Sequence, residues 1–227
     1  MGKRLTLSDA DRDLVTNAVT AAEAQTDGEI VTMIARRSDS YHDVGLHWAI
    51  ATVFVVISVF AAFPDFYRDI ILRLTGSWEH QLSERALLTW LLGIVIVKFL
   101  AVRYIFAWMP LRMALTPRAT RARRVRRRAV LLFRTSAEAR TRARTGVLIY
   151  LSLDEHRAEI VADAAINAKV APEAWGDAMA ALIGEIRAGR PAHGLAEAVR
   201  QTGAILAAHF PRSADDSNEL PDRLIEL

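Results

Sequence analysis

The sequence predicts an α/β protein in which helices cover a small mixed sheet, interrupted by a two-helix transmembrane hairpin. Two observations support this prediction. Two apolar segments, residues 46–63 and 86–109, are long enough to cross a membrane, and strand-like and helical patterns lie on both sides of them. One helix and one strand precede the apolar segments, which is too little for a core. We therefore expect the flanking parts to fold together around an inserted hairpin.

The hairpin prediction rests on length and charge. No charged residue occurs between Val44 and Phe63, and about twenty residues at ~1.5 Å each cross the hydrocarbon layer. The second segment contains Lys98 and Arg103, which we interpret as snorkelling towards the headgroups. The alternative is a functional intramembrane charge, which is less favoured because neither span contains an acidic partner.

Positive charge predicts the orientation. Twelve arginines fall between Arg112 and Arg144, against one acidic residue, Glu138, whereas the connection 64–85 has balanced charges. The positive-inside rule therefore places both termini in the cytoplasm. The Ala- and Arg-rich composition indicates a bacterial chain, so we expect a multi-pass protein of the inner membrane. The apolar side chains of residues 66–74 favour a helix on the outer surface.

The soluble elements follow from hydrophobic period and capping. Ser8 begins a helix with a capping-box pattern, and residues 29–35 form a β-branched strand. A basic helix is expected at 116–133, continued or restarted at 136–144, before a hairpin of strands 146–153 and 158–162. Two helices, from Pro172 and at 194–210, end the domain. The predicted boundaries are 5–42 plus 112–211 for the split soluble domain, 44–109 for the hairpin and 212–227 for a loose tail.

Three stretches resemble one known family. Gly146–Val161 is similar to the central hairpin of the TPM domain, Ile186–Val199 to its two closing helices, and Asp27–Ile34 to its first strand. That family includes the thylakoid lumen phosphatase, the photosystem II repair protein and the levamisole-receptor modulator. The resemblance covers roughly residues 5–40 and 115–211. It implies an αβα sandwich, often membrane-tethered, with phosphatase activity and a bound divalent cation in some members.

The chain departs from the family pattern after the second strand of the hairpin. A glycine-rich acidic turn is usual there, but this chain has Ala162–Asn167, which keeps Asp163 and contains no glycine. Glycine permits φ > 0 and close backbone approach, whereas alanine does so only at a cost. The departure favours a non-catalytic interaction or assembly module over the alternative, a divalent-metal-dependent phosphatase.

The best candidate metal site combines Asp163 with Asp27 and Glu29. Asp163 ends one predicted strand and Asp27 precedes another, so their carboxylates are candidates to meet at one end of the sheet. Oxygen ligands of this kind suit Ca²⁺ or Mg²⁺ and would position a phosphate ester. The alternative is a turn-capping aspartate and a solvated glutamate. The chain has no cysteine, which excludes thiolate chemistry, and its histidines lack metal-ligand spacing.

A basic stretch follows the second apolar segment. It contains Arg118, Arg121, Arg123, Arg124, Arg126, Arg127 and Arg128. Next to a membrane helix, such a cluster is expected to set topology and to contact anionic headgroups. A nucleic-acid partner is not expected, because stacking aromatics and a known binding module are both absent. The expected partners are therefore the bilayer and another membrane protein.

Overall fold

A computed structural model describes residues 7–76, 82–136, 145–213 and 220–227. The chain forms two compact units, one of residues 1–39 and 118–227 and one of residues 40–117. The boundaries expected from the sequence, 42/44 and 109/112, differ slightly from the observed ones at 39/40 and 117/118.

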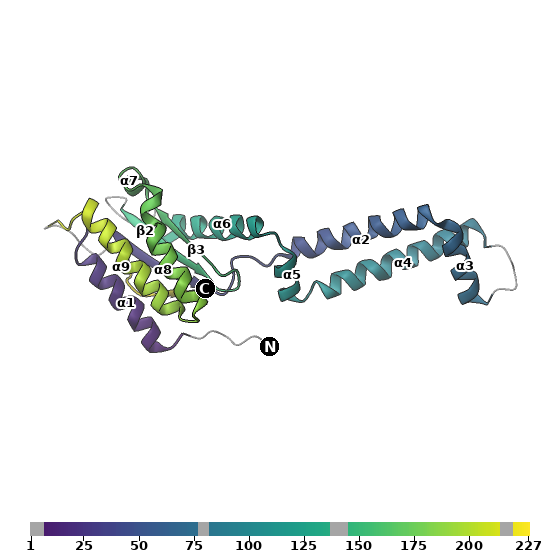
Figure 1. Cartoon of the computed structure of the whole chain (residues 1–227), viewed down its shortest axis with the longest axis horizontal. Helices are drawn as coiled ribbons and strands as arrows, with labels where there is room; N and C mark the ends of the chain where they lie inside the picture. The colour runs from purple at the N-terminus through teal and green to yellow at the C-terminus, as the bar shows by residue number, and fades with distance from the viewer. Residues whose placement is uncertain (1–6, 77–81, 137–144, 214–219) are drawn as a thin grey trace. The chain divides into compact units, whose positions relative to one another are not determined.

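The first unit is an α/β sandwich on a four-stranded sheet (Figure 1). Its strands are β1 (Glu29–Ala35), β2 (Gly146–Ser152), β3 (Arg157–Ala162) and β4 (Ile225–Glu226). Its helices are α1 (Asp9–Glu23), α6 (Arg118–Ser136), α7 (Ala164–Asn167), the 3₁₀ helix η1 (Pro172–Trp175), α8 (Gly176–Arg187) and α9 (Pro191–His209).

The sheet is mixed, as predicted. Its order is β3-β2-β1-β4, with β2 antiparallel to β3 and both other pairs parallel. Glu29 lies opposite Gly146 and Ala35 opposite Ser152, so β1 and β2 pair over their full length. Parallel neighbours require a crossover connection. Residues 40–117 and α6 lie within this crossover, which lets one fold close around an inserted unit.

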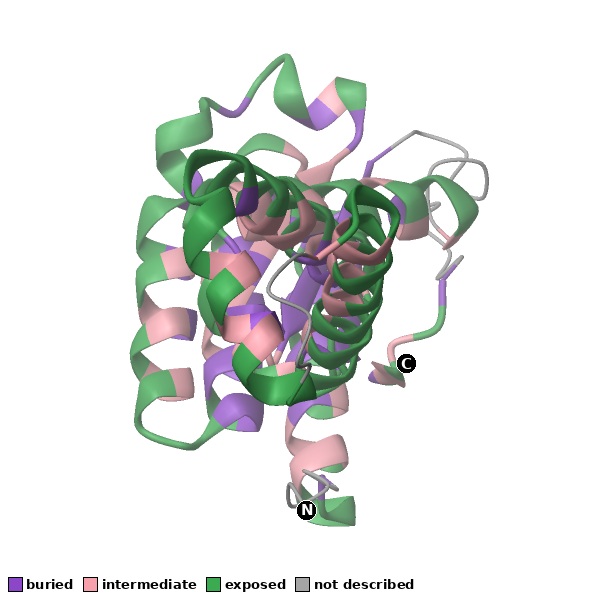
Figure 2. Cartoon of the chain, turned by 90° about the vertical axis from the view of Figure 1, so that its right-hand side faces the viewer, coloured by how far each residue is buried: buried purple, intermediate pink, exposed green. Residues whose placement is uncertain are grey.

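The two faces of the sheet bury two separate cores. Ile30, Ile34 and Ile149 face α1, α8 and α9, whereas Val31 and Leu148 face α6. This is the two-residue alternation of a strand, applied to strands covered on both faces. Figure 2 shows the strands as the buried interior of this unit. The expected αβα layering is thus present in the first unit.

The helix that begins the fold has the predicted cap. The Ser8 hydroxyl accepts from Asp11 N at 3.1 Å, and the Asp11 carboxylate accepts from Ser8 N at 3.0 Å. Helix α1 then packs closely on α9 (Figure 1). A Cβ on Gly203 would lie 2.5 Å from Cβ of Ala22, so only glycine permits this approach.

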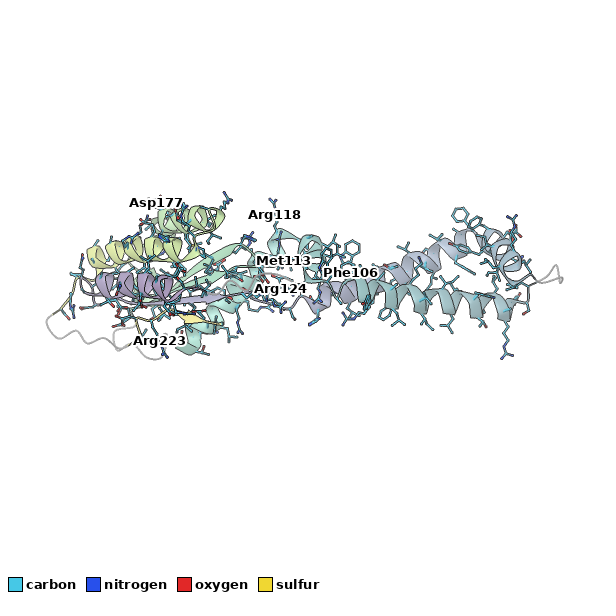
Figure 3. All side chains as sticks on the ribbon, turned by 90° about the horizontal axis from the view of Figure 1, so that it is seen from below. Phe106, Met113, Arg118, Arg124, Asp177 and Arg223 are labelled. Carbon is cyan, nitrogen blue, oxygen red and sulfur yellow. The ribbon has the colours of Figure 1, made fainter. Side chains whose placement is uncertain are left out.

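The second unit contains the apolar segments as helices. It comprises α2 (His42–Ala62), α3 (Pro64–Thr75), α4 (Glu84–Ile105) and α5 (Met109–Leu115). Helices α2 and α4 pack against each other, and both are long and apolar enough to cross a membrane. Their outer faces remain uncovered (Figure 3): Phe54 is 65% exposed and Leu88 63%. The expected helix in the connection is present as α3.

Arg112 ties the base of this unit together. Its buried guanidinium donates to Phe106 O at 2.6 Å, Ala107 O at 3.1 Å and Ser40 O at 2.7 Å. Two of these carbonyls follow α4 directly and the third precedes α2. A cation is favourable at a helix C-terminus, where carbonyls lack helical partners. Arg112 belongs to the run of arginines that is expected to set topology, whereas its contacts in the structure are structural.

Two elements differ from expectation. Residues 212–227 were expected to be a loose tail, but Leu220 and Leu224 are buried and β4 pairs with β1. The short segment becomes ordered because it covers an otherwise open edge and apolar surface of the sheet. Residues 172–175 form a 3₁₀ turn, so the helix expected from Pro172 is α-helical only from Gly176. The continuation expected at 137–144 lies outside the described residues.

Candidate functional site

Two carboxylates of the predicted metal site, Asp163 and Glu29, lie at one end of the sheet, but each accepts a hydrogen bond from a different backbone N–H. Asp163 Oδ2 accepts from Gly146 N at 3.0 Å, and Gly146 pairs with Glu29 across β1 and β2. Glu29 Oε2 accepts from Leu220 N at 3.2 Å. Asp163 and Glu29 are both buried. Each carboxylate therefore supplies an acceptor for a buried backbone N–H.

Asp27 has a similar role at the surface. Its Oδ1 accepts from Ser213 N at 2.6 Å, and its carbonyl accepts from the Thr145 hydroxyl at 2.9 Å. Within the described residues, no group of three or more His, Asp or Glu side chains could hold a metal ion. Where the family pattern has glycines, residues 164–167 form the helical turn α7.

Glu23 is a further carboxyl near Glu29, and it was not among the residues expected from the sequence to form a site. Glu23, at the end of α1, is buried, and its Oε1 accepts from Ile30 N at 2.7 Å. Burial, reinforced by the nearby carboxylates of Glu29 and Asp222, raises the pKa of Glu23 to about 8. No spacing in the sequence marks this residue, because its surroundings come from three distant segments.

The opposite end of the parallel strands holds a polar network. Ser38 N donates to Glu155 Oε1 at 3.0 Å, and the Ser38 hydroxyl lies 2.9 Å from Ser152 Oγ and 3.0 Å from Tyr150 OH. The Ser152 hydroxyl also donates to Glu155. Burial raises the pKa of Tyr150, so its phenol stays protonated. The network fixes the chain after β1 to the β2–β3 turn.

The arginines of α6 divide into three groups. Arg124 points inward and pairs with Asp39 at 2.9 Å (Figure 3). A second group is exposed and consists of Arg123, Arg127 and Arg128, of which Arg123 and Arg127 line a shallow hollow together with Arg126. The third group lines a groove beside β3 and consists of Arg118, Arg121 and Arg126. All seven are expected from the sequence to form one lipid-facing cluster, but a helix distributes adjacent residues around its circumference.

An open groove lies beside β3 in the described part of the first unit. It has a volume of about 850 Å³ and runs along β3 between α6 on one side and η1 with α8 on the other. Its basic residues are Arg118, Arg121, Arg126, Arg157 and Arg187. Glu159, which is half-buried, pairs with Arg126 at 3.3 Å. Burial raises the pKa of Glu159, against the effect of that arginine.

Lys98 and Arg103 both lie exposed on α4. Counting only residues that the structure describes, no carboxylate forms an ion pair with either. The snorkelling interpretation of these two side chains stays a prediction.

Comparison with known proteins adds fold information. No protein-family model and no curated protein matches the chain. The chain is similar to the solved NMR structure of the BA42 protein from the psychrophilic bacterium Bizionia argentinensis. The two share 17% identity with a TM-score of 0.57, over 100% of this chain and 99% of the other. At this level of identity the likeness shows a shared fold.

Proposed function

We propose that this protein is a membrane-anchored, TPM-like module that binds another membrane protein at the cytoplasmic face of the bacterial inner membrane. In this proposal it supports assembly and has no catalytic role. The observation that supports it best is the open basic groove beside β3, because the predicted acidic residues are engaged with the backbone. A large concave surface with unused charges suits binding.

The anchor is supported by the exposed apolar surface of α2 and α4. Fully burying a large aliphatic or aromatic side chain is worth about 1.5–3 kcal/mol. Phe54, Val55, Leu92 and Val97 are each at least 59% exposed, which water would penalise and lipid would not. Since the arginines flank the outer ends of this hairpin, the positive-inside rule favours cytoplasmic termini.

The outer face of α6 is suited to the membrane surface. Arg123, Arg126, Arg127 and Arg134 surround Val130 and Leu131 in a shallow hollow, and Leu131 is 52% exposed. Each basic residue near an anionic surface contributes about 1 kcal/mol. Anionic headgroups would therefore hold this face, whereas the groove beside β3, which shares Arg126 with the hollow, would remain for a protein.

The anchor and orientation can be tested in cells. We expect the full chain to resist alkaline extraction from membranes, and a reporter fused after Leu227 to be active in the cytoplasm. A reporter active only in the periplasm would overturn the orientation, and release by alkali would overturn the anchor.

The interaction role is tested by purifying the full chain from detergent. We expect one membrane protein to co-purify in near-stoichiometric amount, and to do so equally with Asp163→Asn. In parallel, the full chain is assayed on p-nitrophenyl phosphate with Mg²⁺ or Ca²⁺. Metal-dependent turnover that is lost in Asp163→Ala and kept in the exposed control Asp177→Ala would replace the binding proposal with the phosphatase alternative.

A further inference from the structure

The free edge of β3 is the floor of the basic groove. Strand β3 ends the sheet order, and among the described residues no strand pairs with its outer side. Asp163 N donates to Gly146 O, so these two residues form a hydrogen-bonded pair of the antiparallel ladder. The hydrogen-bonded pairs between β3 and β2 then recur at every second residue. The N–H and C=O groups of Ala158 and Ile160 are therefore directed away from β2, towards the groove.

Unpaired edges of this kind accept further strands. Natural proteins usually cover or block such an edge, because it is a template for an extended chain. Here the helices on both faces leave the edge open, and Ala158, Ile160 and Ala162 line the groove. The outward-facing carbonyl of Ala162 already accepts a hydrogen bond from the Asn167 side-chain amide at 2.7 Å. The outward-facing carbonyls of Ala158 and Ile160 remain for an added strand.

The two walls of the groove differ in chemistry. Side chains on the α6 side of β3 are Arg157 and Glu159, and this wall continues with Arg118 and Arg121. The other wall is formed by Trp175, Met179 and Ile183, on the side where Ala158 and Ile160 join the core. Only Arg187 adds charge on that side.

Much of the positive charge in the groove is not neutralised within the described chain, although Arg126 pairs with Glu159. Within the described chain, no carboxylate forms an ion pair with Arg118, Arg121 or Arg187. The Nε atom of Arg121 is buried and has no hydrogen-bond partner. A buried donor without a partner costs free energy, which a carboxylate in the groove would recover.

We propose that β3 binds an extended segment of a partner protein in which acidic and apolar residues alternate. Successive side chains of an added strand point to opposite faces of the sheet, so acidic residues would meet the arginines of α6 and apolar residues would meet α8. Backbone bonds to Ala158 and Ile160 supply affinity, and the walls supply specificity. This inference rests on the proposed binding function and specifies its partner.

The test uses the full chain in detergent and fluorescein-labelled hexapeptides, with binding followed by anisotropy. We expect the alternating (Val-Glu)₃ peptide to bind. Its isomer Val₃-Glu₃ cannot place acidic and apolar side chains on opposite walls, and alternating (Val-Lys)₃ lacks charge complementarity. Both should bind at least about tenfold more weakly than (Val-Glu)₃. Equal binding of the three peptides would overturn the proposal.

Backbone methylation isolates the ladder. Two further (Val-Glu)₃ peptides carry N-methyl groups on all valines or on all glutamates, so that side chains and net charge stay constant. Only one set of backbone N–H groups faces β3. It is that of the valines if the peptide adds antiparallel to β3, and that of the glutamates if it adds parallel. We expect one set to weaken binding by about a hundredfold and the other to have little effect. Equal effects of the two sets would refute an added strand.

Protein variants complete the experiment. Arg187→Glu, at an exposed position, should weaken (Val-Glu)₃ at least about tenfold, as should Arg121→Gln, whereas Arg127→Glu on the outer part of α6 should not. Unchanged binding in Arg187→Glu and Arg121→Gln would overturn the assignment to this groove. If the co-purified membrane protein still binds Arg187→Glu while the peptides do not bind at all, this inference fails and the proposed function stands. If no protein co-purifies and phosphate-ester turnover appears, the proposed function fails.

Discussion

Replacing Glu23 by glutamine should make the first unit less sensitive to alkaline pH. The Glu23 carboxyl is buried between α1, β1 and the C-terminal segment, and its Oε1 accepts from Ile30 N at 2.7 Å. Because burial raises its pKa to about 8, the group is mostly protonated at neutral pH in the folded chain. Glutamine keeps the acceptor for Ile30 N and cannot ionise.

The sign follows from proton binding. The pKa is 4.5 in the ordinary case and about 8 when folded, so between these values the folded state holds a proton that the unfolded state has lost. Stability must therefore fall as the pH rises through this window. At ~1.4 kcal/mol per unit, the loss approaches about 3 kcal/mol at pH ~7 and is at most about 5 kcal/mol above pH ~8. Below pH ~4.5 the carboxyl is protonated in both states and contributes no loss.

The loss of stability is limited by how strongly the C-terminal segment, residues 220–227, is held. Leu220 N bonds to Glu29, and the Asp222 carboxylate accepts from the Thr20 hydroxyl at 2.6 Å. If ionised Glu23 costs more than this segment contributes, the segment detaches and water solvates the carboxylate. We therefore expect hydrogen exchange at residues 220–227 to accelerate above pH ~8 in the natural protein more than in Glu23→Gln.

The assay is thermal unfolding of the full chain in one detergent at pH ~5, ~7 and ~9. Glu23→Gln should melt close to the natural protein at pH ~5 and progressively higher at pH ~7 and ~9. The exposed control Glu173→Gln should track the natural protein throughout. A Glu23→Gln difference that is constant with pH, or that shrinks towards pH ~9, would refute this reasoning.

Three further predictions concern packing and are checked by thermal or denaturant unfolding and by proteolysis. Gly203→Ala should destabilise the first unit by about 1–3 kcal/mol, because the new Cβ meets α1 at 2.5 Å. Gly184→Ala, with nothing within 4 Å, should stabilise it by about 0.5–1 kcal/mol, and the same sign in both would contradict the packing account. Arg112→Lys should open the base of the second unit to protease nearly as much as Arg112→Ala, since one ammonium cannot replace a fork of donors; full rescue by lysine would count against it. Leu224→Asp should cost about 2–4 kcal/mol, whereas no loss would show that residues 220–227 are not held.

The sequence predicted most local structure, because local structure depends on neighbours along the chain. The cap at Ser8, the strand at Glu29–Ala35 and the apolar helices are expressed in contiguous residues, and the structure has them. A shared core for the elements before and after the hairpin was also accessible, since they could not form one separately, and the structure has it with β1 parallel to β2. The ordered C-terminal segment was not, because two residues of strand carry no detectable period.

Only the tertiary structure decided what the charged residues do. Seven arginines within one helix formed a single cluster in the sequence, but the fold assigns Arg124 to Asp39 and others to the outer surface or the groove. The candidate carboxylates do share one end of the sheet, yet each bonds a backbone N–H supplied by a distant segment. Glu23 and the Ser38 network gave no sequence signal at all. The physical reason is that hydrophobic period records which side of an element faces inward, whereas the surroundings of a charge are set by contacts between elements far apart in the chain.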